Sequence, residues 1–226
     1  MSKVKLDRIV ADSENSPQRI DRILIVPAHK DDHVPSSRTA CNYQVVESCL
    51  RTLGFDVSYV AKGSYVLVQR IEQIEEQLAQ RTGSGTMGIV SFSFGTTELL
   101  SALYRHAQAH KQHGVAALLA VTPIVDIDPP HIQRIGAKDH VFEGYQGPRS
   151  PGEFKEIIGV LRGTYGIPVM NVAAQFDHIA RLETVLTAFG VDYTKVIPNA
   201  HHSLRHPDHR ADLVQHIREY FQTFSR

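Results

Sequence analysis

The residues with the clearest chemical potential lie where an apolar run gives way to a helical pattern. The run Met87-Gly88-Ile89-Val90-Ser91-Phe92 ends at Ser93. Apolar residues then recur at helical spacing, at Leu99, Leu100, Leu103 and Ala107. This change of period predicts a strand that turns into a helix at Ser93, and the small residues Ser91 and Gly95 allow a sharp turn that exposes its hydroxyl. A serine at such a position is either a nucleophile or an ordinary helix N-cap.

A serine hydroxyl becomes an effective nucleophile only when a base removes its proton during attack and an acid orients that base. The chain offers both groups at the predicted ends of its strands. Besides Ser93 these strand-end side chains are His29, Asp126, Asp177 and His202. They include the nucleophile, acid and base types that acyl transfer requires, and an Asp and a His follow Ser93 in chain order.

The elements that must position these residues alternate along the chain. Strands are expected over 3–10, 22–26, 55–61, 87–92, 115–125, 168–174 and 193–197. Helices are expected over 36–53, around 67–78, after Ser93, around 154–161, over 179–189 and from Pro207 onward. Such alternation predicts an α/β fold with a mostly parallel central sheet and helices on both faces, in which the carboxyl ends of the strands meet at one edge.

The composition favours a soluble globular protein of one domain and gives no indication of the oligomeric state. The 226 residues carry 24 basic and 24 acidic side chains, so no overall field favours nucleic acid as a partner. No apolar run reaches the about 18 residues that a membrane span requires. The only cysteines, Cys41 and Cys49, fall in one expected helix, which argues against a disulfide framework and for a reducing, cytoplasmic location.

Three stretches resemble motifs of the α/β-hydrolase family. Residues 91–95 match its nucleophile corner with Ser91 in place of the first glycine, 173–179 look like its acid loop, and 199–203 look like its histidine loop. The resemblance implies the α/β-hydrolase fold over a single domain of residues 1–226. It also implies Ser93 as nucleophile, Asp177 as acid and His202 as base, with Asp126 and His201 as the alternatives for the acid and the base.

The resemblance further implies two backbone donors for the oxyanion of an acyl-transfer transition state. One is the N–H of Phe94, directly after the nucleophile, and the other is the N–H of His29, in the loop after the strand 22–26. Residues 127–151, rich in Pro and Gly and without a clear period, are expected to form a short cap.

The function expected from these residues is hydrolysis of a small-molecule carboxylic ester or thioester through an acyl-enzyme on Ser93, with no cofactor. Three alternatives remain open at this point. They are an acyltransferase that uses the same three side chains, a non-catalytic binding protein on the same fold, and a lyase or carbon–carbon bond hydrolase.

Two other kinds of site are disfavoured by the sequence. His202, His206 and His209 have a spacing that resembles a metal site, but Pro207 interrupts a helix through them, so no metal is expected. The glycines before Ser93 form neither a G-x-G-x-x-G pattern nor a P-loop with its lysine, so no nucleotide cofactor is expected.

Overall fold

The computed structural model describes residues 19–28, 40–60, 66–81, 86–109, 114–127 and 139–225. The expected strand 3–10 and the predicted oxyanion residue His29 lie outside these ranges.

A six-stranded sheet in the order β2-β1-β3-β4-β5-β6 forms the centre of the fold, and every pairing between its neighbours is parallel. The strands are β1 (Arg22–Val26), β2 (Asp56–Tyr59), β3 (Met87–Phe92), β4 (Val115–Val121), β5 (Val169–Ala174) and β6 (Thr194–Ile197). The expected α/β class and parallel sheet are therefore confirmed.

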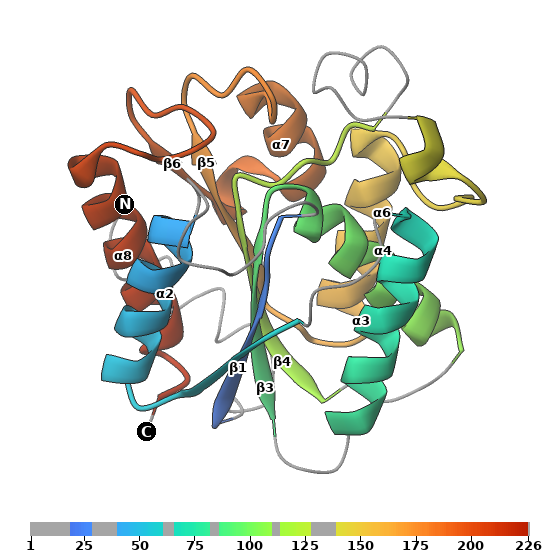
Figure 1. Cartoon of the computed structure of the whole chain (residues 1–226), viewed down its shortest axis with the longest axis horizontal. Coiled ribbons are helices and arrows are strands. Elements are labelled where there is room, and N and C mark those ends of the chain that lie inside the picture. The colour runs from blue at the N-terminus through green and yellow to red at the C-terminus, as the bar shows by residue number, and fades with distance from the viewer. Residues whose placement is uncertain are drawn as a thin grey trace.

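Helices cover both faces of this sheet (Figure 1). They are α2 (Ala40–Thr52), α3 (Leu67–Arg81), α4 (Phe94–Gln108), α6 (Pro151–Gly163), α7 (Leu182–Phe189) and α8 (Pro207–Phe221), with short 3₁₀ turns η1 (Asp139–Phe142) and η2 (Val191–Tyr193). Helices α2 and α8 pack on one face around one apolar cluster, whereas α3, α4, α6 and α7 pack on the other face around a second cluster.

The central strands form because their apolar residues can be buried on both sides. Every residue of β3, β4 and β5 is buried, as expected for parallel strands with helices on both faces. Local signals then set the helix ends. At α6, Ser150 and Glu153 form a capping box with Pro151 at the first position, and Gly190 ends α7 at a φ of 86°.

Two strands are shorter than expected: β2 covers Asp56–Tyr59 of the predicted 55–61, and β4 ends where Thr122-Pro123 breaks the run 115–125. The apolar run that predicts a strand over 115–125 yields β4 only to Val121, because Thr122 adopts a φ of 44° and Pro123 follows it. A left-handed residue turns the chain out of the sheet, and proline has no N–H to donate to a neighbouring strand. Ile124 and Val125 are nevertheless buried, in the cluster under α4 and α6.

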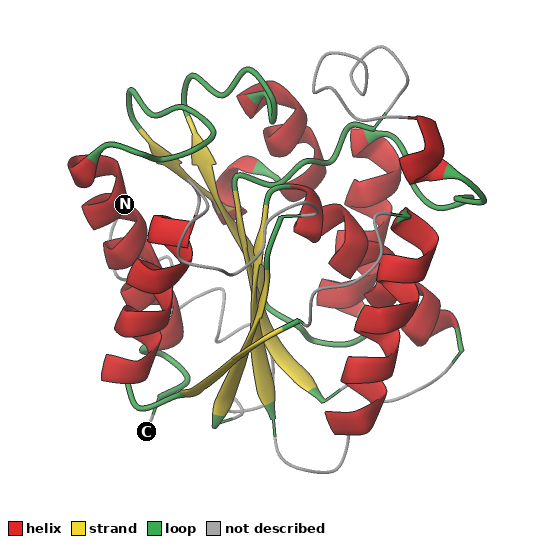
Figure 2. Cartoon of the chain, in the orientation of Figure 1, coloured by secondary structure: helices red, strands yellow, loops and turns green. Residues whose placement is uncertain are grey.

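The corner where β3 passes into α4 and the loops after β5 and β6 lie at the upper edge of the molecule in the view of Figure 2. We call this edge the strand-end edge. The candidate residues within the described ranges lie here: Ser93, Asp126, Asp177 and His202. No helix among the described residues is long and apolar enough to cross a membrane.

Candidate active site

Ser93 lies on a strained corner between β3 and α4. Its φ is 50°, a left-handed value that non-glycine residues adopt rarely and that recurs at functional sites. Its backbone is fixed on both sides: its N–H donates to Val121 O at 2.9 Å, while its carbonyl accepts from the N–H of Thr96 at 3.1 Å and of Ile124 at 3.2 Å.

The corner also requires glycine two residues after Ser93. A Cβ on Gly95 would lie 2.2 Å from the carbonyl oxygen of Pro27 and 3.0 Å from that of Val26. Both contacts are with backbone at the end of β1, which has no side-chain freedom to yield. The first turn of α4 therefore packs directly on the neighbouring strand end, which lifts Ser93 to the strand-end edge.

Three side chains that are distant in sequence form a continuous hydrogen-bonded relay at this edge. Ser93 Oγ lies 2.7 Å from His202 Nε2, and His202 Nδ1 lies 2.7 Å from Asp177 Oδ2. An ionised carboxylate only accepts hydrogen bonds, so Nδ1 carries the proton and Nε2 is left to accept the proton of the serine hydroxyl. The chemistry available to this arrangement is general-base activation of a serine.

The carboxylate of Asp177 is held in one orientation. Its Oδ1 accepts the N–H groups of Ile179 and Ala180, each at 2.8 Å, while Oδ2 faces His202. The side chain is fully buried, whereas the imidazole is 16% exposed. The two backbone N–H groups and His202 thus supply hydrogen-bond partners to both oxygens of this buried side chain.

The structure separates the two predicted alternatives from the relay. His201 is exposed, and its Nδ1 lies 3.0 Å from the carbonyl oxygen of Phe176. Asp126 is half-buried beyond the end of β4, and the carboxylate that contacts His202 is that of Asp177. The geometry thus favours His202 and Asp177 over His201 and Asp126.

Besides the contact of His201 with Phe176 O, three hydrogen bonds donated by backbone N–H groups join the acid loop to the histidine loop. Gln175 N donates to Ile197 O at 3.1 Å, Phe176 N donates to Ala200 O at 2.8 Å, and Asn199 N donates to Gln175 Oε1 at 2.9 Å. These bonds continue the pairing of β5 with β6 beyond the sheet, so Asp177 and His202 lie on two loops that are tied together.

A residue that the sequence analysis did not single out supports the histidine loop from the other side. Asn42, in α2, donates from Nδ2 to the carbonyl oxygen of Ser203 at 2.7 Å, and its Oδ1 accepts from Arg210 Nε at 3.2 Å. Asn42 is 7% exposed. No local pattern marks an asparagine in a helix as the support of a loop about 160 residues away.

Backbone strain is concentrated at the same edge. Among the described residues, the non-glycine residues with positive φ are Ser93, Thr122, Asn199 and Leu204. Ser93 and Thr122 come directly after β3 and β4, and Asn199 comes two residues after β6. Leu204 lies in the loop that carries His202. Residues in such conformations cluster where a precise arrangement of groups is needed.

Of the two predicted oxyanion donors, only Phe94 lies in the described part of the chain. It is the first residue of α4, its side chain is buried, and its ring meets that of Phe142 edge-on at 5.9 Å. The loop after β1 is described as far as Ala28, whose N–H donates to the hydroxyl of Tyr43 at 3.1 Å. His29 lies just beyond it.

The histidines that resembled a metal site serve other contacts. His202 faces Ser93 and Asp177, while the rings of His206 and His209 lie 5.2 Å apart and His206 caps the start of α8 through the N–H of Asp208. Within the ranges that the structure describes, no group of three or more His, Cys, Asp or Glu side chains could hold a metal ion.

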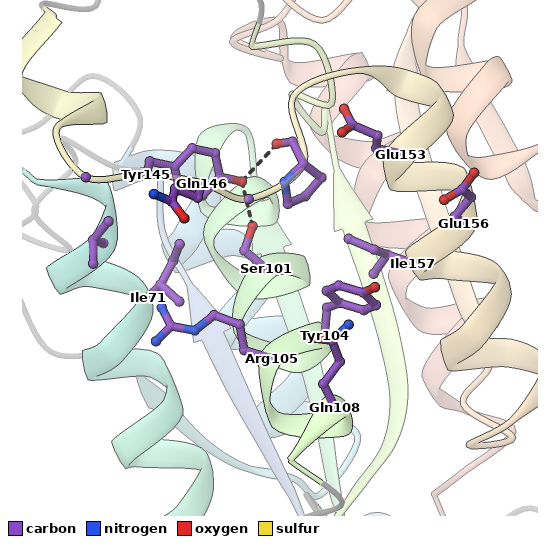
Figure 3. A pocket seen from close by; sticks show the side chains of 14 residues that line it. Ile71, Ser101, Tyr104, Arg105, Gln108, Tyr145, Gln146, Glu153, Glu156 and Ile157 are labelled. Atoms are coloured by element: carbon purple, nitrogen blue, oxygen red, sulfur yellow. Dashed lines mark hydrogen bonds between the residues drawn. The ribbon is translucent and has the colours of Figure 1, made fainter.

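A cleft of about 530 Å³ lies away from the relay, between α3, α4, α6 and the loop 144–148 (Figure 3). Its wall includes Ser101, Tyr104, Tyr145 and Glu153 but none of the three relay residues. Burial raises the pKa of Tyr145 to about 12. Hydrogen bonds from the backbone N–H groups of Arg149 and Ser150 lower the pKa of Glu153. The cleft therefore holds a neutral phenol and an ionised carboxylate, and this carboxylate accepts the Ser150 hydroxyl in the cap of α6 at 2.8 Å.

Comparison with known proteins identifies the fold. Neither a family model nor a curated protein sequence matches this chain. Among solved structures, Est1E from Butyrivibrio proteoclasticus is similar, with a TM-score of 0.67 and 15% identity over 94% of this chain and 92% of that one. The esterase domain of a Rhodothermus marinus protein has a TM-score of 0.59 and 14% identity over 93% and 88% of the two chains.

A third similar structure is XC6422 from Xanthomonas campestris, described as an α/β serine hydrolase without a lid, with a TM-score of 0.53 and 14% identity over 93% of this chain and 86% of that one. The likeness covers nearly the whole chain at low identity. The chain therefore has the α/β-hydrolase fold, as its sequence motifs imply.

Proposed function

We propose that the protein is a serine hydrolase that cleaves a carboxylic ester or thioester through an acyl-enzyme on Ser93. The observation that carries the proposal is the relay of two 2.7 Å contacts, from Ser93 Oγ to His202 Nε2 and from His202 Nδ1 to Asp177. Its similarity in fold to esterases and serine hydrolases supports the same class. The relay meets the geometric requirement for nucleophile, base and orienting acid.

In the first half of the reaction, Ser93 Oγ attacks the carbonyl carbon of the substrate while its proton moves to His202 Nε2. Asp177 stabilises the imidazolium that forms and holds the ring in the correct tautomer. When the tetrahedral intermediate collapses, the bond to the leaving oxygen or sulfur breaks, and His202 returns the proton to the departing alcohol or thiol. The acyl group remains on Ser93.

In the second half, water takes the place of the leaving group. His202 removes a proton from the water as its oxygen attacks the acyl carbon, and it then protonates Ser93 Oγ as the bond to the serine breaks. The carboxylic acid leaves and the free serine is regenerated. The negative oxygen of each tetrahedral intermediate is bound by the N–H of Phe94 and, in this proposal, by that of His29.

The proposal treats residues 1–226 as one catalytic domain in the cytoplasm, with residues 127–151 as a short cap. In the described part of this cap, Ile127, Val141 and Tyr145 are buried in the apolar cluster under α3, α4 and α6. A cap of about 25 residues is too short to form a large helical lid, which favours a small or open acyl site in this proposal.

The test is active-site labelling with a fluorophosphonate probe followed by peptide mapping. Labelling is expected at Ser93 in the wild-type protein and is expected to be lost in His202→Ala, because the hydroxyl then lacks its base. A folded sample that shows no labelling at Ser93 would contradict the proposal and favour a binding protein on the same fold. Turnover of p-nitrophenyl acetate that is redirected to an ester by added alcohol would instead identify an acyltransferase.

A further inference from the structure

Two buried hydroxyl groups face each other across the corner that carries Ser93. Ser91 lies in β3, two residues before Ser93, and Thr96 lies in the first turn of α4, three residues after it. Both residues are 0% exposed, and Ser91 Oγ lies 2.9 Å from Thr96 Oγ1. A buried hydroxyl is unfavourable unless it is hydrogen-bonded, so each of these groups supplies the partner that the other requires.

The pair joins the two segments whose relative position sets the place of the Ser93 hydroxyl. The backbone bonds at the corner connect Ser93 itself with Val121, Thr96 and Ile124. The Ser91–Thr96 contact is different, because it connects the end of strand β3 directly with the first turn of α4. It does not involve Ser93, the strained residue between them. It therefore holds the end of β3 and the first turn of α4 together on either side of Ser93.

We propose that Ser91 and Thr96 are positioning residues that hold Ser93 Oγ within hydrogen-bond distance of His202. This inference rests on the proposed function. Neither side chain reaches the reacting atoms, and both act through the backbone of Ser93. Ser91 stands where the resembling motif has glycine, a residue with no hydroxyl to make the contact with Thr96. Replacing it with that glycine should therefore lower activity.

A positioning role and a purely structural role predict different results for a double substitution. Ser91→Ala or Thr96→Val alone leaves one buried hydroxyl without its partner, which lowers both stability and activity. The double variant Ser91→Ala/Thr96→Val removes both hydroxyls and replaces them with apolar groups of similar shape, so stability should return towards the wild-type value. The hydrogen bond between residues 91 and 96 is still missing in the double variant, so kcat should stay low.

The expected effects are specific. Ser91→Ala, Ser91→Gly and the double variant should each lower kcat by about 10-fold or more, with Ser91→Gly the most affected because glycine also frees the backbone. KM should change by less than about twofold, since the pair does not touch substrate. Thr96→Ser, which keeps the hydroxyl, should retain kcat within about twofold of the wild type.

The matched control is Ser101→Ala. Ser101 is also a buried serine of α4, and its hydroxyl contacts Thr97 O at 2.8 Å and Tyr145 OH at 3.0 Å, away from the corner. Its removal should lower the melting temperature about as much as Ser91→Ala does, but kcat should be unchanged within about twofold.

The experiment measures p-nitrophenyl acetate hydrolysis, fluorophosphonate labelling and thermal unfolding for these variants. Recovery of both kcat and stability in the double variant would overturn the inference, as would wild-type kcat in Ser91→Gly. If the wild-type protein neither hydrolyses the ester nor labels at Ser93, the proposed function fails separately.

In that case the inference is tested in a Ser93→Cys background by the rate of alkylation at residue 93 with iodoacetamide at neutral pH. Contact with His202 favours the reactive thiolate, so adding Ser91→Ala should slow alkylation by about 10-fold. An unchanged rate would overturn the inference.

Discussion

The strand-end edge and the cleft between α3, α4 and α6 both gather hydroxyl and carboxyl groups, but the two regions use them differently. At the edge, Asp177, His202 and Ser93 form a chain that ends on a half-buried hydroxyl. In the cleft, the hydroxyl of Tyr145 donates to Pro148 O at 2.8 Å and lies 3.0 Å from Ser101 Oγ (Figure 3).

The difference shows that cavity volume is a weaker guide to chemistry than the way polar groups are partnered. The hydroxyl groups of the cleft hold the loop 144–148 against α4, and the Glu153 carboxylate caps α6. At the edge, by contrast, a hydroxyl on a strained residue donates to His202, and His202 donates to the buried carboxylate of Asp177. Substitutions in the two regions should accordingly affect different quantities.

The largest effect is expected from Ser93→Ala, which removes the nucleophile at the edge. We expect kcat for p-nitrophenyl acetate to fall by about 10⁵-fold or more while the thermal unfolding curve stays close to that of the wild type. If Ser93→Ala kept activity within about 10-fold of the wild type, Ser93 would not be the nucleophile. Labelling of the cleft would then be the next measurement.

Asp177→Asn is expected to lower kcat by about 10⁴-fold, because an amide donates from its nitrogen and no longer stabilises the correct tautomer of His202. Asp126→Asn is the matched comparison, since this carboxyl group lies at the same edge outside the relay. We expect it to retain kcat within about threefold. Steady-state kinetics would contradict the assignment of the acid if Asp126→Asn were the inactive variant.

Gly95→Ala should destabilise the corner at Ser93, because the new methyl group would clash with the backbone at the end of β1. The new Cβ would lie 2.2 Å from Pro27 O, so we expect the free energy of unfolding to fall by about 3 kcal/mol, together with a loss of activity. Gly159→Ala is the control, because a Cβ on this glycine of α6 meets no atom within 4 Å. It should raise stability by roughly 0.5–1 kcal/mol. Urea unfolding measures both changes.

Tyr145→Phe tests the cleft. It removes the hydroxyl that donates to Pro148 O, so we expect the free energy of unfolding to fall by about 1 kcal/mol while kcat stays within about twofold of the wild type. A loss of activity larger than the loss of folded protein would show that the cleft takes part in the reaction. It would contradict the assignment of the chemistry to the strand-end edge alone.

The same variant has a pH signature. Burial raises the pKa of Tyr145 from its ordinary value of 10.0 to about 12, so the folded state holds this proton more tightly than the unfolded state. The stability that the phenol contributes is complete below about pH 10 and is lost as the pH rises towards about 12. The difference in stability between wild type and Tyr145→Phe should therefore shrink by about 1 kcal/mol between about pH 9 and pH 11.

Most of the fold could be predicted from the sequence because its signals are local. Continuous apolar runs at Arg22–Val26 and Met87–Phe92 indicate buried parallel strands, and helical spacing after Ser93 indicates α4. The end of β4 was less predictable. Its apolar run continues past Val121 because Ile124 and Val125 are buried too, although they lie outside the sheet.

The class of fold, the corner at Ser93 and the candidate acids and bases at the strand ends could be predicted from the sequence, since these depend on periodicity and on nearby glycine and proline residues. The motif resemblance also placed Asp177 and His202 before Asp126 and His201, but the contacts between these side chains are visible only in the folded chain. Ser93 and His202 are 109 residues apart. Their 2.7 Å contact depends on the order of the strands, on the three bonds that join the β5 and β6 loops, and on the support of Asn42. Such contacts arise from packing between distant segments, which no local pattern of residues encodes.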